Sequence, residues 1–229
     1  MAFPQGADSL GGTYPTFPSL LAGNYTIYDS IVGSYERMVS GAPDGAIYLL
    51  GDSNLNFCAS PVVHPYSVNM GISGVDYRML MDKLKKLHLA NPSGGLHAAG
   101  ALVINCGVNT IGKEIAAGKT EAQMLGNADV MLQRMTNWFT GKGVIIKVAP
   151  IQPGAFANVT NARIAALNDL IVNRFGSKTN WAVVDVNSTL APSGTLLSEY
   201  TPDGGHLNGH AWNTVIGPAV ATALAGLGV

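Results

Sequence analysis

Residues 46–57 read AIYLLGDSNLNF, and this stretch constrains the fold of the rest of the chain. Five apolar residues end at Gly51-Asp52-Ser53, which is typical of a short buried strand closed by turn residues. A serine at the end of such a strand lies at the carboxyl edge of a sheet, where open α/β folds bind their ligands. The stretch therefore predicts a buried strand and makes Ser53 a candidate nucleophile.

The composition favours one compact α/β domain. The chain has 229 residues, of which 47% are hydrophobic and 12% charged, which excludes a disordered or highly charged chain. A net charge of -1 argues against nucleic acid as a partner and leaves a small-molecule or carbohydrate substrate. Residues 1–26 are rich in Gly, Pro, Ser and Thr without periodicity. We expect them to form an irregular arm, with residues 27–229 as a single domain.

Cysteine content and the two ends of the chain give further expectations. Cys58 and Cys106 are too few for a disulfide framework and are expected to be free and buried, and no metal or cofactor is expected. The start lacks the basic and apolar regions of a secretory signal, which leaves a cytoplasmic protein, a cleaved chain, or one exported or particle-associated by another route. Residues 212–229 are apolar but interrupted by Pro218, which favours a buried helix over a membrane span.

Strand and helix patterns alternate along the chain. Strands are predicted at residues 46–50, 66–70, 101–106, 144–149 and 181–186. Helices are predicted at residues 28–39, 75–88, 120–140 and 162–175, and from residue 212 onward. Thr120 and Gln123 have the spacing of a capping box. This alternation implies right-handed crossovers and a three-layer α/β/α sandwich with a mostly parallel five-stranded sheet.

Polar residues follow several of these strands. Ser53 and Asn109 each come directly after an apolar run, and Asp203-Gly204-Gly205-His206 precedes the last predicted helix. In a tight turn, a carboxylate three residues before a histidine can reach the imidazole Nδ1 and leave Nε2 free to accept a proton. The three residue types of an acyl-transfer triad are therefore present, in the order Ser, Asp, His.

Four blocks of the sequence resemble those of the SGNH (GDSL-like) hydrolase family. They are Gly51-Asp52-Ser53, Asn69-Met70-Gly71-Ile72-Ser73-Gly74, Gly107-Val108-Asn109-Thr110 and Asp203-Gly204-Gly205-His206. Any one of these strings is weak evidence alone, but four in the right order, each at a predicted strand end or turn, are specific together.

The resemblance implies a serine esterase with the fold expected above. By it, Ser53 is the nucleophile, His206 the general base and Asp203 its orienting partner. The N–H groups of Ser53 and Gly74 and the amide of Asn109 would form the oxyanion hole. The implied substrates are carboxylic esters, and a short acyl group such as acetyl is favoured, including on carbohydrate.

Two residues depart from the family pattern. Asn54 stands where leucine is commonest, and its expected consequence is the loss of an apolar contact behind the serine. Thr110 stands where an aspartate usually follows the asparagine, and its effect is expected on local loop geometry.

Alternative interpretations remain at several positions. Ser53 could be a helix cap, Ser73 a rival nucleophile, and Asp185 a rival triad acid. Residues 107–113, GVNTIGK, imitate a phosphate-binding loop, although Glu114 replaces the serine or threonine that would hold Mg²⁺.

Two further alternatives concern the whole protein. His206 and His210 are four residues apart and could bind zinc from one helical face, although Leu207 stands where the metalloprotease pattern has glutamate. The scaffold could also be a carbohydrate-binding or particle-attached module without hydrolytic activity.

Overall fold

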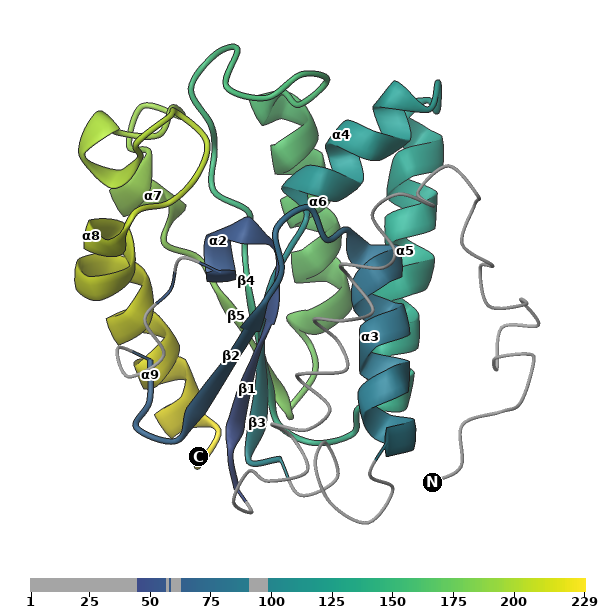
Figure 1. Ribbon diagram of the computed structural model, residues 1–229, viewed down its shortest axis with the longest axis vertical. Helices are drawn as coiled ribbons and strands as arrows, with labels where there is room; N and C mark the ends of the chain where they lie inside the picture. The colour runs from purple at the N-terminus through teal and green to yellow at the C-terminus, as the bar shows by residue number, and fades with distance from the viewer. Residues whose placement is uncertain (1–44, 57, 59–62, 91–98) are drawn as a thin grey trace.

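The computed structural model describes residues 45–56, 58, 63–90 and 99–229 of the chain. These residues form three layers, in which a five-stranded sheet lies between two layers of helices (Figure 1). The arm predicted at residues 1–26 and the helix predicted at residues 28–39 lie outside the described residues.

The sheet is entirely parallel, with the strand order β2-β1-β3-β4-β5. The strands are β1 (Ile47–Gly51), β2 (Ser67–Gly71), β3 (Ala101–Asn105), β4 (Gly143–Ile146) and β5 (Trp181–Val184). This confirms the predicted five-stranded sheet. Because β1 pairs with β2 on one side and β3 on the other, the winding direction reverses between β1 and β3. Open α/β sheets bind ligands at such a reversal, beyond the carboxyl ends of the strands.

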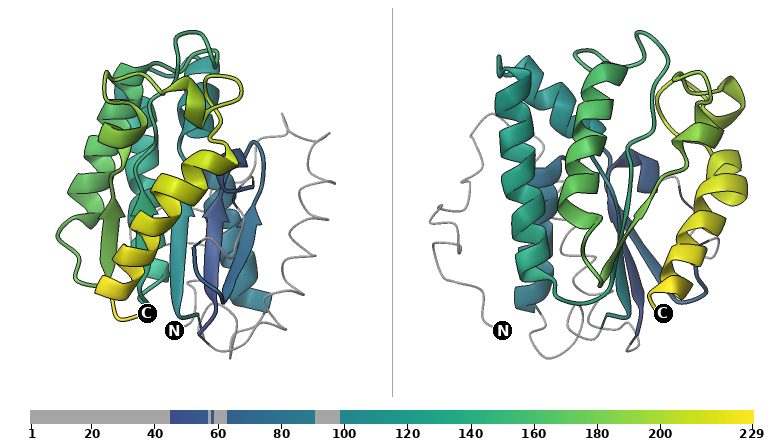
Figure 2. Two further views of the ribbon diagram at one scale, coloured as in Figure 1. Left: turned by 90° about the vertical axis from the view of Figure 1, so that its left-hand side faces the viewer. Right: turned by 180° about the vertical axis from the view of Figure 1, so that it is seen from behind.

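Long helices cover both faces of the sheet (Figure 2). One layer contains α3 (Tyr77–Ala90), α5 (Glu121–Trp138) and α6 (Asn161–Phe175), and the other contains α9 (Gly217–Gly226). The shorter helical segments are α2 (Ser53–Asn56), α4 (Val108–Ala116), α7 (Asn187–Leu190), the 3-10 turn η4 (Ser198–Tyr200), α8 (Gly209–Ala211) and the π-helical segment η5 (Trp212–Ile216).

Alternate residues of β1 face the two helical layers. Tyr48 and Leu50 belong to the core shared with α3, α5 and α6, whereas Ile47 and Leu49 belong to the core shared with α9. All four are fully buried, and each large apolar side chain buried in this way contributes roughly 1.5–3 kcal/mol. Burial on both faces explains why the strands are continuous apolar runs in the sequence.

Several local predictions are confirmed. The Thr120 hydroxyl accepts a hydrogen bond from the Gln123 N–H at 3.2 Å, and the Gln123 side chain accepts one from the Thr120 N–H at 3.0 Å. Cys58 and Cys106 are free and buried. The C-terminal residues form η5 and α9, with Trp212 fully buried. Within the described part of the chain, no helix combines the length and apolar character needed to cross a bilayer.

Candidate active site

Ser53 is the first residue of α2, directly after β1. Asp52 fixes this turn, because its Oδ1 accepts a hydrogen bond from the Asn54 N–H at 3.0 Å and its carbonyl accepts one from the Asn56 N–H at 3.1 Å. Since Asp52 caps the helix, the alternative that Ser53 serves as the cap is wrong. Ser53 instead lines a cavity at the carboxyl edge of the sheet.

Asp203 and His206 form a closely coupled pair in the turn before α8. His206 Nδ1 lies 2.6 Å from Asp203 Oδ2, while Asp203 Oδ1 accepts hydrogen bonds from the N–H groups of Gly205 at 3.0 Å and His206 at 2.8 Å. Burial alone would raise the pKa of Asp203, but the hydrogen bonds from His206 and Gly205 lower it from 3.8 to about 2. An ionised carboxylate at Nδ1 leaves Nε2 as the proton acceptor.

One cavity of about 250 Å³ brings together Ser53, Asn109 and His206. The other residues that line it are Asp52, Asn54, Val108, Gly112, Lys113, Phe156, Ala157 and Val159. A hydroxyl, an amide and an imidazole therefore share one cavity, with apolar side chains along part of its wall. Asp203 lies behind His206 as its partner.

Gly74 is joined to this cavity through Lys113. The Lys113 side chain lines the cavity, and its Nζ donates a hydrogen bond to the Gly74 carbonyl at 2.6 Å. Gly74 has a φ of 80°, and a Cβ at this position would meet nothing within 4 Å. Within the protein, backbone conformation and not lack of space therefore requires glycine here, because side-chain-bearing residues rarely adopt this φ.

Solved structures with the same arrangement of sheet and helices identify the fold. A GDSL-like lipase from Bacteroides thetaiotaomicron aligns over 85% of this chain and 97% of its own, with 17% identity and a TM-score of 0.64. The chain has the GDSL-like hydrolase fold.

Two further structures have this GDSL-like fold in common with the chain. A Streptococcus pneumonia protein provisionally described as a platelet activating factor aligns over 90% of this chain and 95% of its own, with 21% identity and a TM-score of 0.69. An acetyl xylan esterase aligns over 78% and 98%, with 15% identity and a TM-score of 0.55. The sequence matches no protein-family model and no curated protein at a significant level. The roles of individual residues therefore rest on the geometry of the site.

The GDSL-like fold places Asn109 on a helix that the sequence analysis did not predict. Residues 107–110 were taken as a turn, but α4 begins at Val108, and the Ile111 N–H donates to the Gly107 carbonyl at 3.1 Å. The phosphate-loop alternative for residues 107–113 is therefore wrong, because from Val108 onward the segment is a regular helix. Asn109 lies in its first turn, half-buried at the cavity.

Asn54 has a role that the sequence did not reveal. Its side-chain oxygen accepts a hydrogen bond from the Leu207 N–H at 2.9 Å, and both residues are buried. The residue after the nucleophile is thereby tied to the residue after the base. The expected loss of an apolar contact is thus accompanied by a polar contact between two distant parts of the chain.

Asp52 is the second residue that sequence analysis missed. Its side chain is 1% exposed, and burial raises its pKa from 3.8 to about 6, although hydrogen bonds from the N–H groups of Asn54 and Gly107 act in the opposite direction. The carboxyl group connects the first sequence block to the third from beneath the serine.

Phe156 packs against the imidazole in the loop between β4 and α6. The rings of Phe156 and His206 meet edge to face, with centroids 5.0 Å apart and planes at 81°. Such pairs contribute roughly 0.5–1.5 kcal/mol beyond their burial. With Asp203 at Nδ1, this contact helps to hold the orientation of His206.

The structure also decides the remaining alternatives. Asp185 pairs with Lys147 at 2.6 Å rather than with His206, and Ser73 is an exposed residue outside the cavity lining. His210 stacks on Tyr200, with centroids 5.4 Å apart and an interplanar angle of 16°. Among the residues that the structure describes, no group of three or more His, Cys, Asp or Glu side chains is arranged to hold a metal ion.

Proposed function

We propose that the protein is a serine ester hydrolase that acts on short acyl esters such as acetyl esters, including those of carbohydrates. One observation carries the proposal: His206, paired with Asp203 at 2.6 Å, lines the same cavity as Ser53. A serine and an oriented base beside one cavity are the minimum machinery for acyl transfer. Lipases and an acetyl xylan esterase with the same fold are consistent with this chemistry.

The reaction would proceed through an acyl-enzyme. Ser53 Oγ attacks the ester carbonyl while His206 Nε2 accepts its proton, and His206 then returns this proton to the departing alcohol. Water, activated by the same imidazole, attacks the acyl-enzyme and releases the acid. Asp203 stabilises the imidazolium in both steps.

The oxyanion would be bound by the N–H groups of Ser53 and Gly74 and by the Asn109 amide. Each such donor is worth roughly 3 kcal/mol of barrier, because it is oriented before charge develops on the carbonyl oxygen. We expect Asn109→Ala to retain the nucleophile and base but lose one of these donors.

The cavity supports a short acyl group. Its volume of about 250 Å³ lies below the range of roughly 300–1,000 Å³ that is usual for sites of drug-sized ligands. Val108, Phe156 and Val159 provide apolar walls suited to a few methylene groups.

Turnover of chromogenic esters from acetyl to octanoyl tests the proposal directly. We expect highest activity on the shortest chains and a loss of roughly 10⁴-fold or more in kcat for Ser53→Ala and for His206→Ala. A Ser53→Ala protein with full activity would show that the assignment is wrong.

A fluorophosphonate probe separates the hydrolase from a binding module on the same fold. The probe should label the wild-type protein at Ser53 and leave Ser53→Ala unlabelled, because covalent reaction requires an activated serine. An unlabelled wild-type protein that still binds carbohydrate would favour the binding module.

A further inference from the structure

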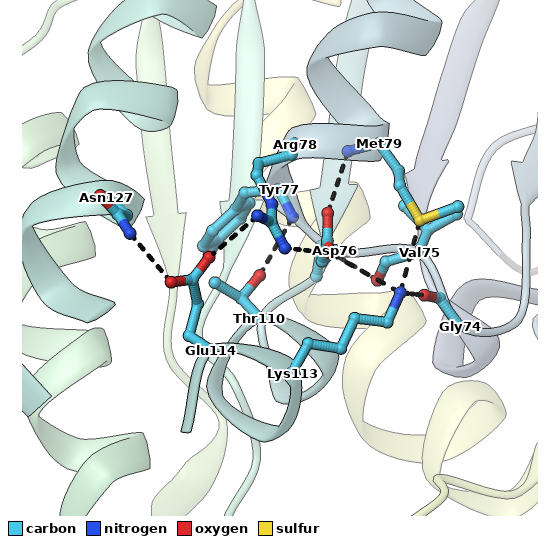
Figure 3. Close-up of polar contacts among 11 residues, drawn as sticks. Gly74, Val75, Asp76, Tyr77, Arg78, Met79, Thr110, Lys113, Glu114 and Asn127 are labelled. Atoms are coloured by element: carbon cyan, nitrogen blue, oxygen red, sulfur yellow. Dashed lines mark hydrogen bonds and ion pairs between the residues drawn. The ribbon is translucent and has the colours of Figure 1, made fainter. Parts of the chain in front are cut away.

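Lys113 is directed toward the loop that carries Gly74 (Figure 3). Its Nζ donates to the Gly74 carbonyl at 2.6 Å, lies 3.6 Å from Asp76 Oδ2 and contacts the Met79 sulfur at 3.4 Å. The same side chain lines the cavity that contains Ser53. A lysine that resembled part of a phosphate loop in the sequence is thus held between the cavity and the Gly74 loop.

Asp76 gives the Lys113 ammonium a fixed counter-charge. Its side chain is 3% exposed, and its Oδ1 accepts a hydrogen bond from the Met79 N–H at 3.0 Å at the start of α3. Arg78 approaches the same carboxylate at 3.4 Å. Because this carboxylate is buried and hydrogen-bonded, the position of the ammonium is better defined than in a surface ion pair.

Two further contacts join α4 to this region (Figure 3). The Thr110 hydroxyl accepts a hydrogen bond from the Tyr77 N–H at 3.0 Å, which gives the departure at Thr110 a structural role. Glu114 lies 3.4 Å from Arg78 and accepts a hydrogen bond from the Asn127 amide at 2.9 Å. The helix that carries Asn109 and the loop that carries Gly74 are therefore linked at several points.

Gly74 has a particular need for such a link. Glycine adopts positive and negative φ about equally readily, so the φ of 80° at Gly74 is not fixed by the residue itself. A hydrogen bond to its carbonyl restricts the rotation that would also turn its N–H. The Lys113 ammonium is the group that makes this bond.

We propose that Lys113 is a positioning residue for the oxyanion hole: it holds the Gly74 peptide in register with the Asn109 helix and keeps a positive charge beside the hole. The inference rests on the proposed hydrolase function. Displacement of a catalytic group by about 1 Å can lower a rate roughly 100-fold, so a tether of this kind acts on kcat. Because Lys113 acts through Gly74, its removal should leave substrate binding nearly unchanged.

Three variants test this role on a short acyl ester. Lys113→Met keeps the length of the side chain but removes the charge and the donor, and it should lower kcat roughly tenfold or more, with KM changed by less than about twofold. Lys113→Arg retains a donor and should recover part of the loss. Arg78→Gln removes another cation of the same cluster that does not contact Gly74, and it should lower thermal stability but keep kcat near the wild-type value.

The outcomes are distinct. Equal losses of kcat in Lys113→Met and Arg78→Gln, or a loss in KM alone, would overturn the positioning role and leave general stabilisation of the cluster. An unchanged kcat in Lys113→Met, with Ser53→Ala inactive, would overturn this inference while the hydrolase proposal stands.

Amide hydrogen exchange provides a readout that does not depend on activity. Peptides spanning residues 72–76 and 108–112 should exchange faster in Lys113→Met than in the wild-type protein, and more so than in Arg78→Gln. If no ester is turned over by the wild-type protein, the hydrolase proposal fails, and the exchange data still decide whether Lys113 restrains the loop. Unchanged exchange in both peptides would contradict the tether.

Discussion

Asp52→Asn is expected to change how stability depends on pH. The side chain is buried beneath the nucleophile, and Asn has nearly the same shape and retains an oxygen that can accept the Asn54 N–H. The substitution removes only the ability to ionise in a site where burial raises the pKa to about 6.

The expected magnitude follows from this pKa. A value about two pH units above the ordinary 3.8 corresponds to about 3 kcal/mol, since each unit equals about 1.4 kcal/mol. Between these two values the unfolded chain has released a proton that the folded protein still holds, so unfolding releases a proton and stability falls as pH rises. The penalty is absent below pH 3.8 and fully present above about pH 6.

Urea unfolding of the wild type and the variant at intervals from pH 3.5 to pH 7.5 measures this effect. The free energy of unfolding of Asp52→Asn, relative to wild type, should rise by about 3 kcal/mol across this range and level off near pH 7. Asp185→Asn serves as a control of opposite sign, because the pKa of Asp185 is lowered by its contact with Lys147 in spite of partial burial. A difference between wild type and Asp52→Asn that stays constant with pH would refute the reasoning.

Three other substitutions test contacts around the cavity. Asn54→Leu leaves the buried Leu207 N–H without its acceptor and should cost about 1–3 kcal/mol in urea unfolding and lower kcat; wild-type stability would show that the contact contributes nothing. Gly74→Ala forces alanine into a φ of 80° and should cost about 1–2 kcal/mol, and its kcat should fall because the N–H is displaced. Phe156→Leu removes the edge-to-face contact with His206 and widens the cavity, so the ratio of hexanoyl to acetyl ester turnover should increase. An unchanged ratio would exclude Phe156 from the acyl-binding wall.

Much of the fold could be predicted from the sequence, because its strands are buried on both faces. Continuous apolar runs such as residues 46–50 are typical of strands buried in this way, and their alternation with amphipathic segments leaves a parallel sheet as the simplest solution. The capping box at Thr120 shows that local hydrogen bonding is also encoded locally. Asp203 and His206 could be paired for the same reason, since both lie in one short turn.

The missed features depend on long-range contacts or on mixed local signals. Asn54 and Leu207 are 153 residues apart, so no pattern around either residue indicates their hydrogen bond. The burial of Asp52 depends on three sequence blocks meeting at one place. Helix α4 was missed because Asn109, Thr110 and Gly112 are poor helix formers, although Val108 and Ile111 had helical spacing.

The strand order has a consequence for dividing the protein into two pieces. The exposed turn at residues 117–119 separates β1, β2 and β3 from β4 and β5, and these two blocks meet along the single pairing of β3 with β4. Ser53, Gly74 and Asn109 belong to the first piece, whereas Asp203 and His206 belong to the second. Exposed turns are favourable cleavage points, so chains divided here would hold the nucleophile and its base on separate polypeptides. Ester hydrolysis would then report the reassembly of the two fragments.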